Sequence, residues 1–287
     1  MYAVLGVTGN TGSVVAEELI RRGKKVRVIV RSVEKGESWK ARGADVAIAS
    51  VDDPKALAAA LSGAEGAYLL SPPDMSETDM TAHGRKVGDS FAEAIRISGV
   101  PHVVFLSSIG GQHETGTGPI RALHQIEERL TPLGINVTIL RPTYFMENGG
   151  SSLGPAAASG VFPTFLPADL RLPQIATKDI GVFAADALEN PAKGVRILEL
   201  AGPEDYTTNE IAAIVGGILG KDVKVAEGPL DAVVPTFMSY GISEHIAGLF
   251  REMYEGLING QVAWDGKGER HRGVTTPAEV FKGMLKK

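Results

Sequence analysis

The sequence predicts an α/β protein with a doubly wound parallel sheet and a smaller, mostly helical C-terminal lobe. Three observations lead to this fold class. Strand-like apolar runs alternate with helical stretches up to Arg141, a glycine-rich turn follows the first run at once, and the alternation stops after Arg141. The chain has 287 residues, of which 44% are hydrophobic and 22% charged, so it can bury a full core.

Six runs define the expected strands of the first half: AVLGV, VRVIV, DVAIA, AYLLS, HVVFLS and NVTIL. Helical periodicity fills the intervals between them, as in the segment DDPKALAAAL, which begins with a helix start signal. Such alternation predicts βαβ units with right-handed crossovers. Farther on, we expect a helix over 179–188, a strand at RILELAG, and mostly helix from Thr208 onward.

Residues 142–178 interrupt this pattern, because glycines and prolines are scattered among small and apolar residues. A long irregular insertion is expected here. Its apolar side chains, such as Phe162, Phe165 and Leu166, would be costly to expose, so a lid over a ligand is favoured over a poorly ordered surface loop.

Charge and composition exclude several classes of function. The chain has 29 Lys and Arg against 34 Asp and Glu, a net charge of −5, and no basic stripe, which argues against binding to nucleic acid. It has no cysteine, and its six histidines form no close pair, so no metal site is predicted. The start does not resemble a signal peptide and no run is long enough to span a bilayer, so a cytoplasmic protein without a membrane partner is expected.

The glycine-rich turn GVTGNTG lies between the first strand and the first helix. Gly6 permits a tight turn at the strand end, Gly9 permits backbone approach to a pyrophosphate, and Gly12 permits close packing of helix and strand. The amides of Asn10 and Thr11 then belong to a helix N-terminus, which favours an anion. The turn is therefore predicted to hold the phosphates of a dinucleotide.

The end of the second strand indicates which dinucleotide is bound. An acid at this place usually binds the ribose hydroxyl of NAD, whereas this chain has Arg31. A guanidinium can pair with the 2′-phosphate of NADP through two hydrogen bonds, and Lys35 is placed to assist. NADP is therefore predicted over NAD; the alternative is an exposed arginine at a strand end.

Several stretches resemble the NmrA-like group of atypical short-chain dehydrogenases/reductases: GVTGNTG, HVVFLSSIG, RGVTTPAEVF and, most specifically, TILRPTYFMEN. The resemblance implies a Rossmann domain that binds NADPH and an activity like that of the quinone and triphenylmethane reductases of this group. It implies an NADP-binding domain over 1–148, to which 178–202 return, and a substrate-binding lobe made by 149–177 and 203–287.

The same resemblance distributes the cofactor over the strand ends. The pyrophosphate would lie on the turn, Arg31 would meet the 2′-phosphate, and the ends of three further strands would flank the adenosine and the nicotinamide. The full predicted cofactor site comprises Gly6, Thr8, Gly9, Asn10, Thr11, Gly12, Arg31, Lys35, Ser71, Pro72, Ser107, Ser108, Tyr144 and Phe145.

The sequence offers two candidates for the proton donor. The YxxxK pair of classical relatives has no counterpart, because no tyrosine or lysine occurs between Ser108 and Pro132. His124 is the best candidate, with a pKa suited to proton transfer, although it could equally pack on the sheet. Tyr144 could donate instead, or could serve shape and stacking.

A quinone-like or dye-like acceptor needs less help from a proton donor, so we expect reduction of a small electron-poor organic compound by NADPH. The alternative is a protein that senses NADP(H) without turnover and acts through a protein partner. An apolar C-terminal stretch at helical spacing could dock a partner or form a homodimer contact, but the core of the small lobe is favoured. Its residues are Phe237, Met238, Leu249, Phe250, Met253, Tyr254 and Leu257.

Overall fold

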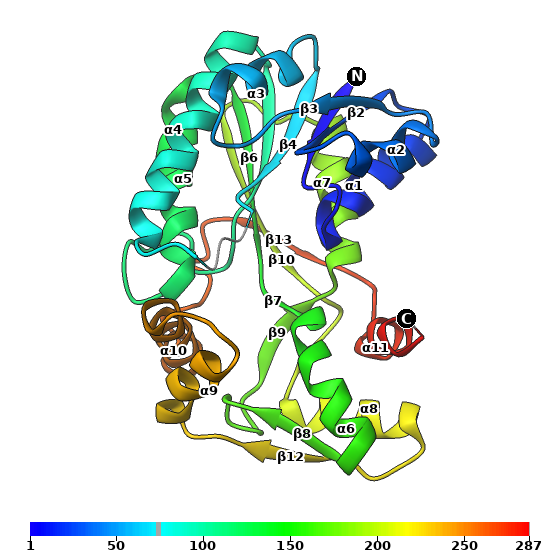
Figure 1. The fold of residues 1–287 in the computed structure, drawn as a ribbon, viewed down its shortest axis with the longest axis vertical. Coiled ribbons are helices and arrows are strands. Elements are labelled where there is room, and N and C mark those ends of the chain that lie inside the picture. Colours follow the sequence, from blue (N-terminus) through cyan, green and yellow to red (C-terminus); the bar gives the residue numbers. More distant parts are fainter. Residues whose placement is uncertain (73–75, 287) are drawn as a thin grey trace.

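The protein is described by a computed structural model that covers residues 1–72 and 76–286. Its main feature is an eight-stranded sheet with the order β13-β10-β6-β5-β4-β1-β2-β3, in which all neighbours run parallel (Figure 1). The predicted doubly wound parallel sheet is confirmed. Its strands are β1 Tyr2–Leu5, β2 Val26–Val30, β3 Asp45–Ile48, β4 Gly66–Leu70, β5 His102–Leu106, β6 Asn136–Pro142, β10 Val195–Ala201 and β13 Glu269–Arg272.

Helices cover both faces of this sheet (Figure 1). One layer contains α3 Pro54–Leu61, α4 Met80–Ser98 and α5 Arg121–Leu130; the other contains α1 Asn10–Arg21, α2 Glu34–Lys40 and α7 Thr177–Glu189. Each layer encloses its own apolar core, one around Phe91 and Phe105 and the other around Leu19 and Ile180. The order of the strands reverses at β1, with β2 and β3 on one side of it and β4, β5 and β6 on the other. Such a switch point leaves a crevice at the carboxyl ends of the strands.

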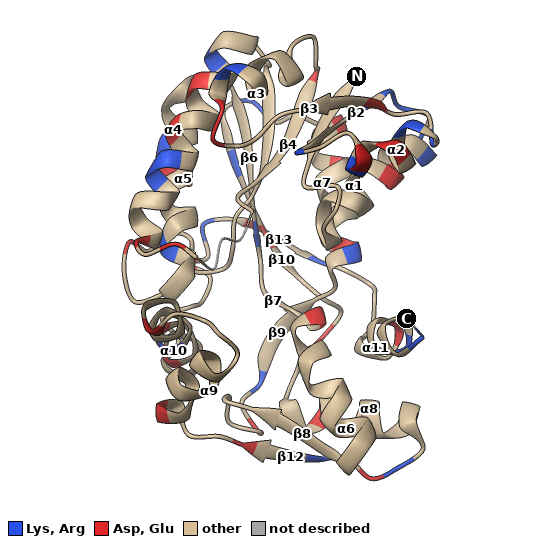
Figure 2. Cartoon of the chain, in the orientation of Figure 1, with Lys and Arg blue, Asp and Glu red and all other residues tan. Residues whose placement is uncertain are grey.

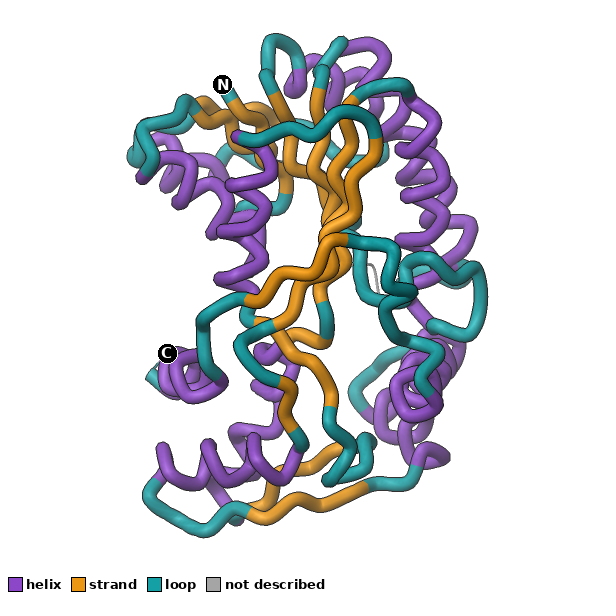
Figure 3. The backbone as a smooth tube through the Cα atoms, turned by 180° about the vertical axis from the view of Figure 1, so that it is seen from behind, coloured by secondary structure: helices purple, strands orange, loops and turns teal. Residues whose placement is uncertain are grey.

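The smaller lobe combines helices with two small sheets, of order β11-β9-β7 and β12-β8 (Figure 3). Its helices are α6 Leu153–Ser159, α8 Thr208–Leu219, α9 Val233–Ser239, α10 Glu244–Asn259 and α11 Pro277–Leu285. Its strands are β7 Tyr144–Phe145, β8 Val161–Thr164, β9 Leu172–Ile175, β11 Asp205–Tyr206 and β12 Lys224–Glu227. The chain also forms 3₁₀ turns, at Gly118–Ile120, Thr131–Leu133, Met146–Ser152 and Leu230–Ala232.

Two expectations need correction. Residues 142–178 are not an irregular insertion, since they contain β7, α6, β8 and β9. These strands have two to four residues, so they are too short to show alternation, and β8 and β9 pair with segments later in the chain. The segment 203–287, assigned to the smaller lobe, also contributes β13 to the large sheet beside β10. The sequence of β13 is entirely polar, so it does not predict a strand of the large sheet. In the structure, Arg270 of β13 pairs with the fully buried Glu199 of β10.

The described part of the chain has neither a membrane-spanning helix nor a cluster of metal ligands. None of its helices is both long and apolar enough to cross a membrane. Residues 1–72 and 76–286 also contain no cluster of three or more His, Asp or Glu side chains suited to a metal ion.

His102 makes the stability of the large sheet depend on pH. Its ring is 1% exposed, and burial lowers its pKa from 6.5 to about 4. The unfolded chain therefore binds a proton that the folded chain excludes, so this contribution is complete above pH 6.5 and is lost as the pH falls toward 4. The loss is about 3 kcal/mol of unfolding free energy. Urea unfolding at pH 7 and pH 4.5 should show a steeper decline in the parent protein than in His102→Gln; equal declines would contradict this role.

Candidate functional site

Five strand ends converge at one edge of the large sheet. Gly6 follows β1, Arg31 follows β2, Ser71 follows β4, Ser107 follows β5 and Thr143 follows β6. The parallel register keeps these ends nearly level, since the last residues of β4 and β5, Leu70 and Leu106, pair with each other and Leu106 pairs with Leu140, two residues before the end of β6. This carboxyl edge faces the smaller lobe (Figure 1). The structure thus brings the sequence-predicted cofactor residues along a single edge.

The glycine turn has no room for a side chain at Gly6 or Gly12. Gly6 has φ +76°, and a Cβ atom there would lie 2.6 Å from Leu70 Cδ2. The Gly9 N–H donates to the Gly6 carbonyl at 2.9 Å. A Cβ atom on Gly12 would lie 2.5 Å from the Gly6 carbonyl, so the close approach of α1 to β1 requires glycine.

The N-terminus of α1 lacks an internal cap. Its N-cap is Gly9, which offers no side-chain acceptor, and its first turn contains no acid. In contrast, Asp53 caps α3 and Asp79 caps α4. Thr8, Gly9 and Asn10 are exposed at this end. Unpaired amide donors at an open helix start are suited to a phosphate group.

Thr11 is the buried member of this turn. Its Oγ1 accepts a hydrogen bond of 3.0 Å from the Tyr68 hydroxyl, inside the core. Burial raises the pKa of the Tyr68 phenol, so the donor stays protonated. The Thr11 side chain therefore fixes α1 against β4, and only its backbone is available to a ligand.

Arg31 and Lys35 lie at the end of β2 and in the first turn of α2, and both are exposed. Within the described residues, neither side chain makes an ion pair or a hydrogen bond. Two uncompensated cations beside the glycine turn match a phosphate monoester better than a ribose hydroxyl.

Ser107 is held by a buried ion pair. Its hydroxyl donates to Glu127 on α5, and Arg141 of β6 contacts the same carboxylate through Nε at 3.1 Å and Nη2 at 2.6 Å. Both charged side chains are less than a tenth exposed. Ser107 is therefore a fixed part of the sheet edge, whereas the neighbouring Ser108 is partly exposed. The available signal was Arg141 at the end of the apolar run NVTIL, whereas Glu127 lies in a largely polar helix that gave none.

Glu127→Gln should reduce the free energy of unfolding by about 3 kcal/mol, because it removes the bidentate counter-charge of the buried Arg141 guanidinium and leaves only Asp265, 3.8 Å from Nη1. The matched control is Glu269→Gln, which breaks the more exposed pair with Arg196 and should cost less than about 1 kcal/mol. Urea denaturation of both variants gives the comparison. Equal losses of unfolding free energy would show that the buried pair stabilises the protein no more than the exposed pair does.

A cavity of about 460 Å³ opens in the smaller lobe, next to the end of β6. The segment 142–178 supplies much of its wall, together with β12, α9 and α10. The ring of Phe165 is part of the lining, 6.3 Å from Phe237 and 5.8 Å from Tyr254 between centroids. Aromatic walls of this kind favour flat, apolar ligands. The aromatic lining includes Tyr144, Phe162, Phe165, Phe237, Tyr240 and Tyr254.

Tyr144 joins the sheet edge to this cavity. Its side chain is hydrogen-bonded to Tyr254 and Asn148, and burial followed by the nearby Tyr254 raises the pKa of its phenol. The hydroxyl is therefore a neutral donor at physiological pH. Phe145 packs instead against the apolar core that contains Leu19, Ile175 and Ile180.

His124 lies away from the cavity lining. Its Nδ1 is 3.0 Å from the carbonyl oxygen of Gly111, which can only accept, so Nδ1 carries the proton. Its Nε2 is 3.9 Å from Glu128. The described lining of the cavity does not contain His124, so its role as a proton donor stays a prediction.

Comparison with known proteins gives the family. Residues 2–265 match the model of the NmrA-like family. This chain belongs to the NmrA-like family. An NAD(P)H azoreductase of Xenophilus azovorans is 25% identical over 255 residues, covering 88% of this chain and 86% of that protein. Quinone oxidoreductase 2 of Escherichia coli K12 is 25% identical over 272 residues, covering 93% and 91%.

Solved structures agree with this NmrA-like assignment. The NADPH complex of the Escherichia coli quinone oxidoreductase has a TM-score of 0.82 at 26% identity and covers 99% of this chain and 100% of that one. The NADP(H) complex of the Citrobacter sp. triphenylmethane reductase has a TM-score of 0.83 at 20% identity and covers 99% of both chains, which shows the shared fold.

The apolar C-terminal stretch of this NmrA-like chain forms mostly lobe interior, as favoured. Leu249 and Leu257 are buried, and Phe237 packs 5.0 Å from Phe250 between ring centroids. Met238 is 47% exposed, and the neighbouring Tyr240 is 76% exposed. A docking surface would therefore be limited to the outer side of α9.

Proposed function

We propose that this chain is an NADPH-dependent oxidoreductase that transfers hydride to a small, electron-poor aromatic acceptor, quinone-like or dye-like. The observation that carries the proposal is the position of Tyr144, which ends the row of strand-end residues and begins the lining of the aromatic cavity. A cofactor along the edge and an acceptor in the cavity would thus meet at this residue. The names of the relatives, which include NAD(P)H azoreductase and quinone oxidoreductase, support the same reaction class.

The residues of the edge fit NADPH. The glycine turn lets α1 approach β1 closely, α1 offers an N-terminus without a side-chain cap, and Arg31 with Lys35 offers unpaired charge for the 2′-phosphate. Ser71, Pro72, Ser107 and Ser108 would line the remaining edge. NADPH supplies the hydride when bound.

The residues of the cavity would bind and orient the acceptor. The Phe165 and Tyr254 rings would stack on its face, and the Tyr144 hydroxyl would donate a hydrogen bond to an acceptor oxygen or nitrogen. Apolar walls would exclude water. A quinone-like acceptor forms a stabilised anion on reduction, so this site would not need a strong acid, and His124 would be dispensable.

We further infer a cytoplasmic site of action, in keeping with the use of NADPH, and a small molecule as the main partner. A homodimer through the exposed Met238 of α9, which is not part of the cavity lining, is a separate proposal, and sedimentation of the parent protein and of Met238→Glu would test it.

The test of the proposed function is anaerobic NADPH oxidation with enzyme in excess, in a single turnover. The acceptors are a quinone, an azo dye, a cationic dye and a ketone. Rapid oxidation with a quinone or dye is expected, and little with the ketone. If NADPH binds but no acceptor oxidises it, the protein senses NADP(H) and the proposal is wrong.

A further inference from the structure

The charges of the aromatic cavity are unbalanced. Glu227, at the end of β12, is the one formally charged side chain among the described residues of the lining, which includes no lysine or arginine. Two segments of the neighbouring wall, α6 and β8, carry no charged residue at all (Figure 2). A ligand in this cavity would therefore meet one negative charge and no positive charge.

The backbone holds Glu227 in place. The strand β12 pairs with β8, and Glu227 is opposite Thr164 in the register. Next to it, Gly228 packs so closely on the Phe165 ring that a Cβ atom would lie 3.0 Å from it. Strand pairing and this contact therefore hold the backbone of Glu227 in the wall of the cavity, and its side chain is exposed.

The Glu227 carboxylate is also uncompensated. Its Oε1 accepts the N–H of Ala168 at 2.7 Å, the single hydrogen bond that the described residues give this side chain. Across residues 1–72 and 76–286, no cationic group lies within ion-pairing distance of it. The second oxygen is thus available to a ligand.

We propose that this cavity selects acceptors by charge, taking aromatic cations ahead of neutral rings and rejecting anionic ones, and that Glu227 is the residue that determines this selection. A carboxylate attracts a cation and repels a sulfonate or carboxylate, more strongly beside apolar walls than in water. The faces of Phe165, Phe237 and Tyr254 add cation–π attraction for the same class of ligand. The proposal rests on the proposed function, because it takes the cavity as the acceptor site.

The test uses three redox-inert probes that share one ring system: naphthyltrimethylammonium, methoxynaphthalene and naphthalenesulfonate. Calorimetry should give the tightest binding for the ammonium and the weakest for the sulfonate. Glu227→Gln keeps an acceptor for the Ala168 N–H and removes the charge, so it should reduce the ammonium-to-sulfonate preference about fivefold, the upper end of the effect of an exposed charge. Glu227→Lys should invert the order.

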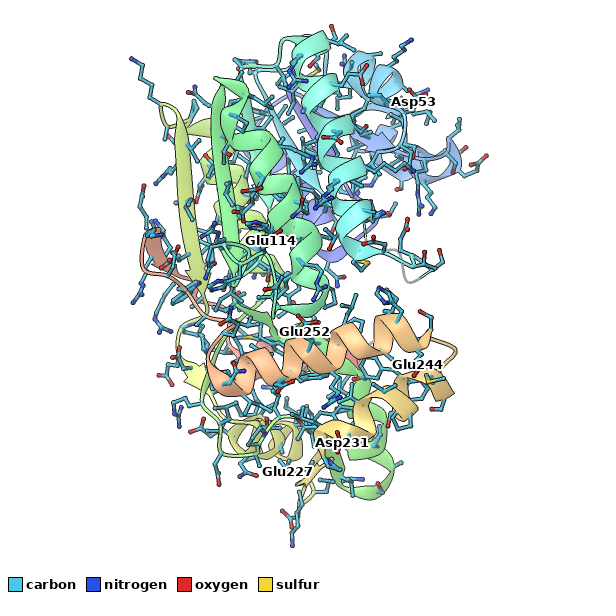
Figure 4. The ribbon with its side chains drawn as sticks, turned by 90° about the vertical axis from the view of Figure 1, so that its left-hand side faces the viewer. Asp53, Glu114, Glu227, Asp231, Glu244 and Glu252 are labelled. Carbon is cyan, nitrogen blue, oxygen red and sulfur yellow. The ribbon has the colours of Figure 1, made fainter. Side chains whose placement is uncertain are left out.

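Asp231→Asn is the matched control. Asp231 is close by in the same lobe (Figure 4), is paired with Arg251 at 3.5 Å, and is not part of the cavity lining. Its substitution changes the net charge equally and should leave the preference unchanged. An unaltered preference in Glu227→Gln, a parent protein that favours the sulfonate, or no binding of any probe would overturn the proposal. Charge-ordered binding without NADPH oxidation would instead refute only the reductase function.

Discussion

Replacement of Gly12 by alanine is expected to abolish measurable NADPH binding. The added Cβ atom would lie 2.5 Å from the Gly6 carbonyl and 2.7 Å from the Leu5 oxygen, and both are backbone atoms that cannot move aside singly. The turn must open, which displaces the amides of α1 from the phosphate position. Overpacking of this kind also costs about 1–3 kcal/mol of unfolding free energy. Titration of the protein with NADPH, followed by fluorescence, measures the first effect and urea denaturation the second.

Gly217→Ala is the matched control for Gly12→Ala. Gly217 also lies in a helix, α8, but a Cβ atom there meets nothing within 4 Å. Alanine at that position should stabilise the protein by about 0.5–1 kcal/mol through helix propensity and leave NADPH binding unchanged. A Gly12→Ala variant that binds NADPH as tightly as the parent protein would refute the assignment of the phosphates to this turn.

Arg31→Asp is expected to reverse the preference between the two nicotinamide cofactors. The substitution removes a charge-assisted pair with the 2′-phosphate and adds repulsion, so NADPH binding should weaken by about 2 kcal/mol or more, roughly 30-fold, relative to NADH. Arg31 is exposed and unpaired among the described residues, so the fold should be unaffected. Dissociation constants for both cofactors provide the measurement.

Lys40→Asp controls for long-range electrostatics. Lys40 is exposed at the end of α2, and Lys40→Asp changes the net charge by the same amount as Arg31→Asp does. It should weaken NADPH binding far less than Arg31→Asp does. Equal losses of NADPH and NADH in Arg31→Asp would remove Arg31 from the 2′-phosphate site.

The large sheet was predictable because its central strands are buried on both faces. A run such as VRVIV is apolar almost throughout, and its identity does not depend on its partner. The glycine turn was predictable for a related reason, since spacing alone defines the close approach of Gly12 to Gly6. Local sequence therefore carried both the fold class and the closely packed glycine turn.

The small lobe was not predictable in the same way. Strand β8 has four residues including Pro163 and pairs with β12, far along the chain, so nothing local marks it. The cavity likewise depends on rings from remote segments, such as Phe165 and Tyr254, that meet only after folding. The position of Glu227 in its wall has the same origin, which is why its role in charge selection emerges only in three dimensions.

Hydrogen–deuterium exchange, measured by peptide mass spectrometry, tests most directly where the two ligands bind. Addition of NADP⁺ should slow exchange in peptides covering 6–13, 31–36 and 107–111. A redox-inert aromatic acceptor analogue should slow exchange in peptides covering 144–166 and 236–254. Protection by NADP⁺ away from the strand ends, or protection by the analogue away from the cavity, would contradict the assignment of hydride transfer to this site.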